Sequence, residues 1–155
     1  MTVLTHFKRC DKTGIDYQYI TTDTSTFRFT LPLYHKRIPK EFINKWVSIT
    51  PGIANTSLVV KVFKGYAFDG CSCVPDIAGT VDAALLHDPI YQFADAIAEA
   101  WEWRVRDVLR MADYYFRLVM IYNNVSDKIV WTYYTGVRLF GYTYNRVSKF
   151  LRWIF

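Results

Sequence analysis

Cysteine, glycine and proline are scarce in this sequence, which contains three, seven and five of them in 155 residues. Cys71 and Cys73 are too close in the chain to form a comfortable disulfide, and the total, with Cys10, is odd, so no disulfide framework is expected. Hydrophobic residues make up 52% of the chain and aromatic residues 18%, unlike disordered or fibrous proteins. We therefore expect a globular protein of a reducing compartment.

Long apolar runs are also missing. The first twelve residues carry several charges where a signal peptide would have its apolar core. In the aromatic C-terminal part the longest uncharged run, residues 129–137, is much shorter than the ~20 residues that cross a bilayer. The sequence thus predicts no signal peptide and no transmembrane segment, in a protein that is soluble or at most peripheral.

Acidic residues are absent from the last 28 positions. Residues 1–78 hold ten Lys/Arg against six Asp/Glu, residues 79–127 hold four against eight, and residues 128–155 hold five against none. The three segments therefore carry +4, −4 and +5. An acidic middle part is often only the solvated face of helices, but this one contains the most specific motif of the chain.

The N-terminal part has the alternation of β-strands. Residues 16–22 and 26–31 alternate apolar and polar side chains around a Thr/Asp/Ser turn, which predicts a β-hairpin. Residues 46–50 and 58–63 predict a second pair, separated by Pro51 and Gly52. The length suits one domain, because about 155 residues bury roughly two thirds of their unfolded surface.

The C-terminal part has the spacing of helices. Thr80 is predicted to be the N-cap of a first helix, and apolar residues recur at helical spacing from 101 to 122, before two asparagines. Ser126 and Asp127 can cap a further helix that Gly136 and Gly141 weaken. The expected fold is α+β: a single domain, residues 1–155, with antiparallel β-hairpins in 1–78, a helical hairpin in 79–127 and a basic aromatic helix in 128–155.

Polar residues with catalytic potential follow the buried Ala/Leu run of the first helix. His87 and Tyr91 lie four residues apart and share a helix face, with Asp88 turned by about 100°. A helical hairpin that turns near residues 98–102 would bring Asp113 alongside His87. A histidine held by one carboxylate can act as a general base, and an adjacent carboxylate can hold a cation.

Other interpretations of these residues remain open. Asp113 could pair with Arg110, Arg117 or His87 in a purely structural network. Pro89 could kink the first helix, at a cost of ~3 kcal/mol. It could also be the first residue of a new helix whose N-cap is Asp88, in which case Asp88 would be occupied by capping.

Four ordered motifs resemble a bacteriophage and prophage family, number 1353 among the domains of unknown function. The family pattern reads G-F-x-x-D-x-x-S-x-P, then A-A-x-x-H-D-x-x-Y, then R-x-x-A-D-x-x-F-x-x-x-M, then A-V-R-L-F-G. The matching residues here are Gly65, Tyr66, Asp69, Ser72 and Pro75; Ala83, Ala84, His87, Asp88 and Tyr91; Arg110, Ala112, Asp113, Phe116 and Met120; and Gly136, Val137, Arg138, Leu139, Phe140 and Gly141. The resemblance spans roughly residues 58–142 and implies a viral protein of the virion or the host cytoplasm.

A looser likeness links the same residues to phospholipases of the secreted A-two class. It implies that His87 is the base, that Asp113 orients it, that Tyr91 hydrogen-bonds Asp113, and that Asp88 binds calcium. Those enzymes take further calcium ligands from a glycine-rich loop, whereas residues 68–73 contain one glycine. Asp69 could instead complete a site for another divalent cation.

The two resemblances predict a hydrolase-like His/Asp centre, with or without a metal, that acts on lipid or peptidoglycan of the cell envelope when a phage enters or lyses its host. The alternative is a non-catalytic virion or tail protein. The last ten residues, from Arg146 to Phe155, mix Arg and Lys with aromatics, and we expect them to contact other virion proteins or a membrane surface. For residues 131–140 a helix that closes the core is the commoner arrangement, and nothing indicates nucleic-acid specificity.

Overall fold

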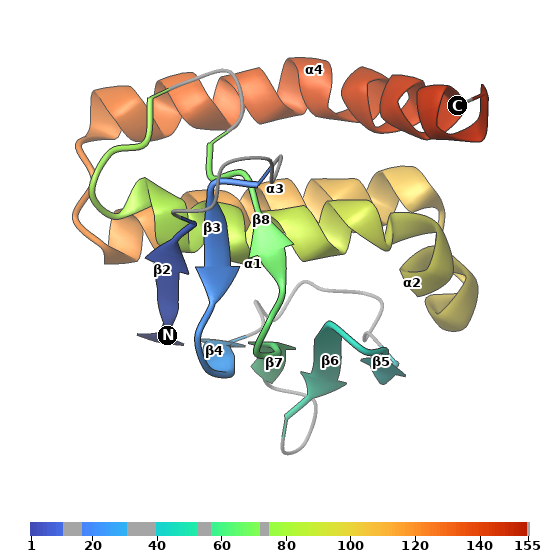
Figure 1. Cartoon of the computed structure of the whole chain (residues 1–155), viewed down its shortest axis with the longest axis horizontal. Coiled ribbons are helices and arrows are strands. Elements are labelled where there is room, and N and C mark those ends of the chain that lie inside the picture. The colour runs from blue at the N-terminus through green and yellow to red at the C-terminus, as the bar shows by residue number, and fades with distance from the viewer. Residues whose placement is uncertain (11–16, 31–39, 53–56, 72–74, 155) are drawn as a thin grey trace.

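The computed structural model describes residues 1–10, 17–30, 40–52, 57–71 and 75–154, with the last eleven of these described by their backbone alone. Within these ranges, eight short strands precede four helices, so the expected α+β fold is confirmed (Figure 1). The strands are β1 (Thr2–Leu4), β2 (Phe7–Arg9), β3 (Tyr19–Thr21), β4 (Ser25–Thr30), β5 (Phe42–Ile43), β6 (Val47–Pro51), β7 (Ser57–Val62) and β8 (Ala67–Phe68). The helices are α1 (Thr80–Gln92), α2 (Ala94–Trp101), α3 (Val105–Tyr122) and α4 (Asp127–Ile154).

The strands form two antiparallel sheets. A five-stranded sheet has the order β1-β4-β7-β6-β5, and a three-stranded sheet has the order β2-β3-β8. The predicted pairing of the second strand pair is confirmed, since Val47 of β6 lies opposite Val62 of β7. Both strands bury apolar residues, as their Val, Ile and Leu content requires.

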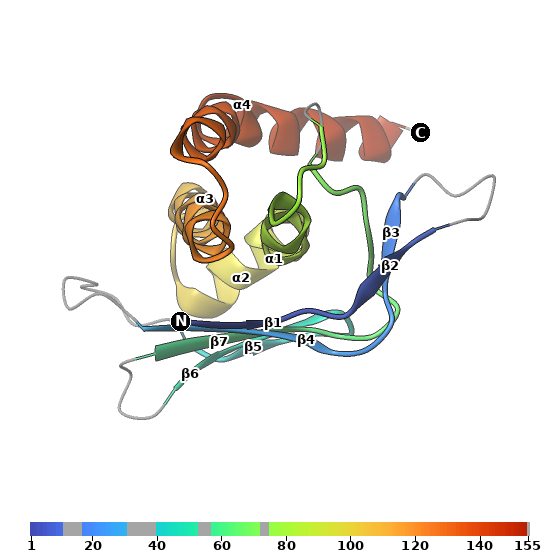
Figure 2. The same cartoon turned by 90° about the vertical axis from the view of Figure 1, so that its left-hand side faces the viewer.

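The predicted hairpin between residues 16–22 and 26–31 is wrong in its pairing. The strands exist, but β3 pairs with β2 and β4 pairs with β1. Together the four strands make one two-stranded ribbon that passes from one sheet to the other (Figure 2). Two hydrogen bonds link its two segments at the bend: the Thr22 N–H donates to the His6 carbonyl (3.0 Å), and the His6 N–H donates to Ser25 Oγ (2.9 Å). Alternation indicates which side chains share a face, but it does not select the partner strand.

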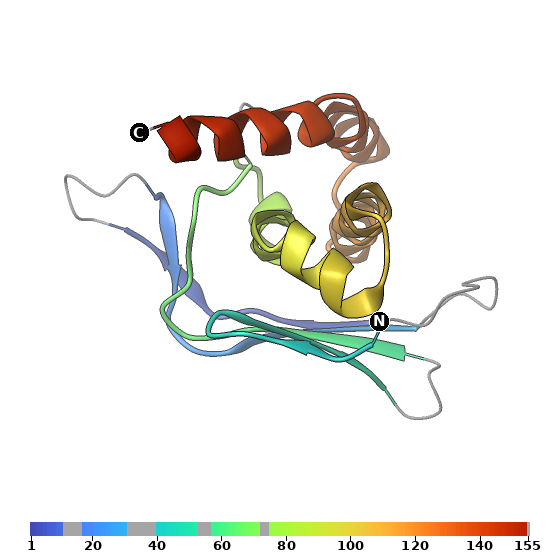
Figure 3. The same cartoon turned by 90° about the vertical axis from the view of Figure 1, so that its right-hand side faces the viewer.

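The helices lie on one face of the five-stranded sheet (Figures 2 and 3). Helices α1 and α3 pack against each other, α1 and α2 contact the strands, and α4 packs on α3 on the side away from the sheet. The fully buried residues between sheet and helices include Phe27, Phe29, Leu58 and Leu85, and the rings of Phe29 and Tyr115 have centroids 4.2 Å apart. This arrangement forms a continuous apolar core.

The N-terminus of α1 differs from the prediction that Thr80 is the N-cap. Gly79 occupies that position with a φ of 86°, and an added Cβ there would lie 2.9 Å from Cβ of Asn123. Thr80 is the first helical residue, and its hydroxyl donates to the Ile77 carbonyl (2.8 Å). Glycine is favoured at this position because other residues are strained at positive φ.

Pro89 lies inside α1, which continues to Gln92. Asp88 is therefore a residue of the helix body and not the N-cap of a new helix, so its carboxylate is not used for capping. The chain reverses through α2 and the left-handed Glu102 (φ 57°) before α3 begins, which is a wider turn than expected. Asn123 ends α3 as predicted, whereas Gly136 and Gly141 leave α4 uninterrupted.

Among the described helices, none combines the length and the apolar character needed to cross a membrane.

Candidate active site

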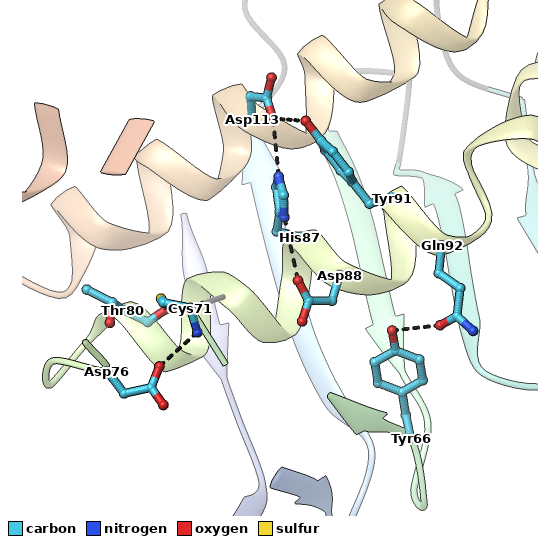
Figure 4. A network of polar contacts seen from close by, with 9 residues as sticks. All are labelled: Tyr66, Cys71, Asp76, Thr80, His87, Asp88, Tyr91, Gln92 and Asp113. Atoms are coloured by element: carbon cyan, nitrogen blue, oxygen red, sulfur yellow. Dashed lines mark hydrogen bonds and ion pairs between the residues drawn. The ribbon is translucent and has the colours of Figure 1, made fainter. Parts of the chain in front are cut away.

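His87, Tyr91 and Asp113 meet between α1 and α3 (Figure 4), and Arg138 of α4 contacts the same carboxylate. Small side chains on both helices, Ala83 and Ala84 of α1 and Ala112 of α3, are almost fully buried. They let the helices approach closely enough for His87 to reach Asp113, 26 residues further along the chain. The predicted helical hairpin therefore does bring these two residues into contact.

Asp113 is the centre of the cluster and is only 2% exposed. Its Oδ1 accepts a hydrogen bond from the Tyr91 hydroxyl (2.6 Å) and lies 3.1 Å from Nε2 of His87. Its Oδ2 accepts a hydrogen bond from the Arg138 guanidinium (3.1 Å). A buried carboxylate is costly unless it is paired and hydrogen-bonded, and these three donors satisfy that requirement.

The contacts of His87 determine which of its nitrogens can act as a base. Both ring nitrogens face carboxylates, and Nε2 makes the shorter contact, so neutral His87 is assigned its proton on Nε2 and its lone pair on Nδ1. Nδ1 lies 3.6 Å from Oδ1 of Asp88, whose side chain is 27% exposed. The side of the imidazole opposite Asp113 is thus the side nearest to solvent.

Two aromatic rings fix the plane of the imidazole. The centroid of Tyr91 lies 4.0 Å from that of His87, and the centroid of Phe116 lies 5.1 Å away. Tyr91 therefore has two roles, because its ring packs on His87 while its hydroxyl donates to Asp113. Ordered packing of this kind holds a functional side chain in one rotamer.

Burial and the two carboxylates act in opposite directions on His87. Burial alone would lower its pKa, but the hydrogen bonds and charges of Asp113 and Asp88 outweigh burial, so the pKa is raised above its ordinary value. Burial raises the pKa of Asp88, and the contact with His87 offsets part of that effect. Burial and the neighbouring Asp113 also raise the pKa of Tyr91, so its hydroxyl stays protonated and remains a donor.

Two residues of α4 belong to the site and were not predicted. The sequence suggested Arg110 or Arg117 as cations for Asp113, but the contact comes from Arg138. One turn later, Gly141 packs on Tyr91, and an added Cβ there would lie 2.4 Å from the Tyr91 hydroxyl oxygen. Arg138 and Gly141 are three residues apart, so a helix places them on one side, and both belong to the last motif of the phage-family resemblance. This spacing is the sequence feature that could have predicted their role.

The predicted metal ligands, Asp88 and Asp69, are neighbours. The backbone N–H of Asp69, which follows β8, hydrogen-bonds the Asp88 carboxylate. In the part of the chain that the structure describes, no group of three or more His, Cys, Asp or Glu side chains is arranged to hold a metal ion. The described residues therefore show a backbone contact between Asp69 and Asp88 but not a pair of carboxylates facing one ion, and the metal stays a prediction.

The loop before α1 is held by Asp76. This residue accepts hydrogen bonds from the Cys71 N–H (2.8 Å) and the Tyr19 hydroxyl (3.0 Å). Burial raises the pKa of the Cys71 thiol to about 12, so the thiol stays protonated, and it donates to the Thr80 carbonyl (3.5 Å).

Nearby, the Tyr66 hydroxyl donates a hydrogen bond to the side-chain oxygen of Gln92 in α1 (2.9 Å). These contacts fix the end of β8 against α1, whereas Ser72 of the predicted motif lies outside the described residues.

Comparison of the chain with protein-family models, curated proteins and solved structures found no match.

Proposed function

We propose that this protein is a phage-encoded hydrolase in which His87 is the general base and the substrate is an ester or amide of the cell envelope, in lipid or peptidoglycan. The observation that carries the proposal is the orientation of His87. Asp113 holds Nε2, while Nδ1 faces the partly exposed Asp88. A base held in this way has one nitrogen for orientation and one for chemistry.

The reaction that fits this geometry begins with a water molecule at Nδ1. His87 takes a proton from the water while the water oxygen attacks the carbonyl carbon of the substrate. The imidazolium then gives the proton to the leaving group as its bond to that carbon breaks. Asp113 and Asp88 stabilise the imidazolium, in agreement with the raised pKa of His87. Tyr91 and Arg138 keep Asp113 in place during both steps.

A divalent cation, calcium or another ion, would be held by Asp88 and Asp69 and would polarise the carbonyl group of the substrate. Asp88 is suited to that task because it is the most exposed member of the group formed with His87 and Asp113.

The second candidate function is a non-catalytic virion or tail protein. Its support is the burial of the cluster, since His87 is 7% exposed and Asp113 is 2% exposed. In that case the network would serve only to join α1, α3 and α4. Activity measurements separate the two functions, because both predict the same contacts.

The experiment is a hydrolysis assay of the purified protein on phospholipid vesicles and on peptidoglycan, with and without calcium. The variant His87→Ala should lower turnover by about 10²–10⁴-fold while circular dichroism shows a folded protein. Asp88→Asn should also lower turnover, and it leaves the contacts of Asp113 intact. The matched control is Asp95→Asn on the exposed face of α2. Equal background turnover by the wild type and all three variants would support the scaffold function.

A further inference from the structure

The outer face of α4 exposes large apolar side chains. Trp131 is 69% exposed, Leu139 66%, Phe140 70% and Tyr142 44%. The spacing of Trp131, Leu139 and Tyr142 places them on one stripe of the helix, whereas Phe140 points to another side, about 180° from Trp131. Side chains on the other side of α4, Val130 among them, are buried against the protein. The exposed stripe is therefore not part of the core, and soluble proteins generally avoid such patches.

The position of α4 makes this stripe accessible to a flat surface. Figure 2 shows α4 as the layer farthest from β1, β4 and β7. The stripe points away from α3, because the residues that pack on the body of the molecule are on the opposite side. A helix in this place can lie along a surface without any rearrangement of the sheet.

The charge of α4 has one sign after its first residue. Asp127 begins the helix, and residues 128–155 contain five Lys/Arg and no Asp/Glu. Of the basic residues, Lys128 is exposed next to the start of the apolar stripe. The surface that α4 complements is therefore anionic.

We propose that this face of α4 binds the anionic surface of a phospholipid membrane. Trp131 and Tyr142 are residues of the kind that concentrate at the membrane–water interface, and Leu139 supplies apolar area that can enter it. Lys and Arg add attraction to anionic headgroups. An apolar stripe next to basic residues is the pattern of helices that lie in the interface.

A second copy of the chain fits this face less well. Two α4 helices packed on each other would bring two sets of basic residues together without any acidic partner on either helix after Asp127. The membrane proposal does not depend on catalysis by His87. If the substrate is a lipid, membrane binding through α4 would bring the proposed active site to the lipid surface, because Arg138 of α4 contacts Asp113.

The test is co-sedimentation of the full chain with vesicles of phosphatidylcholine, with or without phosphatidylglycerol. We expect binding to the anionic vesicles that weakens as salt is added. The double variant Trp131→Ser/Leu139→Ser should reduce the partition coefficient by about tenfold or more, because its apolar contact is lost. The control is Ile43→Ser, which removes a side chain that is 59% exposed on β5, away from α4.

Three outcomes would overturn the proposal: no binding of the wild type to anionic vesicles, equal binding by the double variant, or an equal loss in Ile43→Ser. A dimer in light scattering that the double variant abolishes, without vesicle binding, would assign the face to a second copy. His87→Ala should bind vesicles like the wild type, so failure of the proposed catalysis and failure of membrane binding are distinguishable.

Discussion

At the scale of single residues, Asp113 has the largest expected effect on stability. In the variant Asp113→Asn, the neutral amide replaces a buried charge that accepts from Tyr91 and Arg138 and contacts His87. The loss leaves Arg138 without its carboxylate, and we expect the free energy of unfolding to fall by about 2–4 kcal/mol. Urea denaturation measures the change.

The control for this variant is Asp107→Asn on the same helix. Asp107 pairs with Arg104 near the surface, where such ion pairs contribute about 0–1 kcal/mol. An equal fall in the free energy of unfolding in the two variants would show that Asp113 stabilises the fold no more than a surface ion pair does.

The raised pKa of His87 gives stability and activity opposite pH dependences. Because the folded pKa is higher than the unfolded value of about 6.5, His87 stabilises the fold fully below about pH 6.5, and this contribution is lost as the pH rises through the folded pKa. A general base must be unprotonated, so turnover should rise over the same range. Urea denaturation and rate measurements from pH 6 to 9 test both directions.

In the variant His87→Gln the free energy of unfolding should depend less on pH over this range than in the wild type. An imidazole resonance of His87 that titrates below the ordinary value in nuclear magnetic resonance would contradict the assigned direction.

At the scale of elements, two glycines of α4 should respond to the same substitution with opposite signs. Gly141→Ala places a Cβ 2.4 Å from the Tyr91 hydroxyl oxygen, so we expect a loss of about 1–3 kcal/mol. The added Cβ of Gly136→Ala meets no described atom within 4 Å, so this variant should gain about 0.5–1 kcal/mol, because alanine is the better helix former. Thermal unfolding of both variants would reveal the difference, and equal shifts would mean that α4 does not pack on Tyr91.

Truncation can separate the two parts of α4. Removal of residues 146–155 leaves Val130, Tyr133, Arg138 and Gly141, which make the described contacts of this helix, so thermal stability should change little. Vesicle binding should weaken, because Arg146, Lys149 and Arg152 are removed.

Truncation after Ser126, by contrast, removes Arg138 and uncovers Tyr91 and α3, and should cause large destabilisation. Unfolding of the shorter truncation would show instead that the last ten residues belong to the core.

Local signals in the sequence predicted the elements better than their partners. Helical spacing was enough to place His87 and Tyr91 on one face and to return Asp113 beside them. The pairing of β4 with β1 and the contact of Arg138 with Asp113 join segments more than 20 residues apart in the chain, which no local pattern encodes. The role of Gly79 was missed because Thr80, a residue type common at N-caps, stands next to it.

At the scale of the whole molecule, the sheet and α4 contribute to different parts of the interior. The core between the five-stranded sheet and α1 and α3 consists of side chains such as Phe27, Leu58 and Leu85. The Asp113 cluster lies between α1 and α3, where Arg138 of α4 also reaches it. Substitutions of core residues in the sheet should therefore mainly lower the stability of the fold. Substitutions in α4 should affect both the proposed active site and the proposed membrane surface.

The order of the elements also has a consequence for synthesis. Every described strand ends by Phe68, while the helices that cover the sheet extend to Tyr122. At ~5–20 residues per second, a ribosome needs roughly 3–11 seconds to make the chain between these points. During that interval the inner face of the nascent sheet, with Phe27, Phe29 and Val60, has no helix to cover it. The growing chain is thus most prone to aggregate before its second half is made, when a chaperone that holds extended apolar segments would raise the yield most.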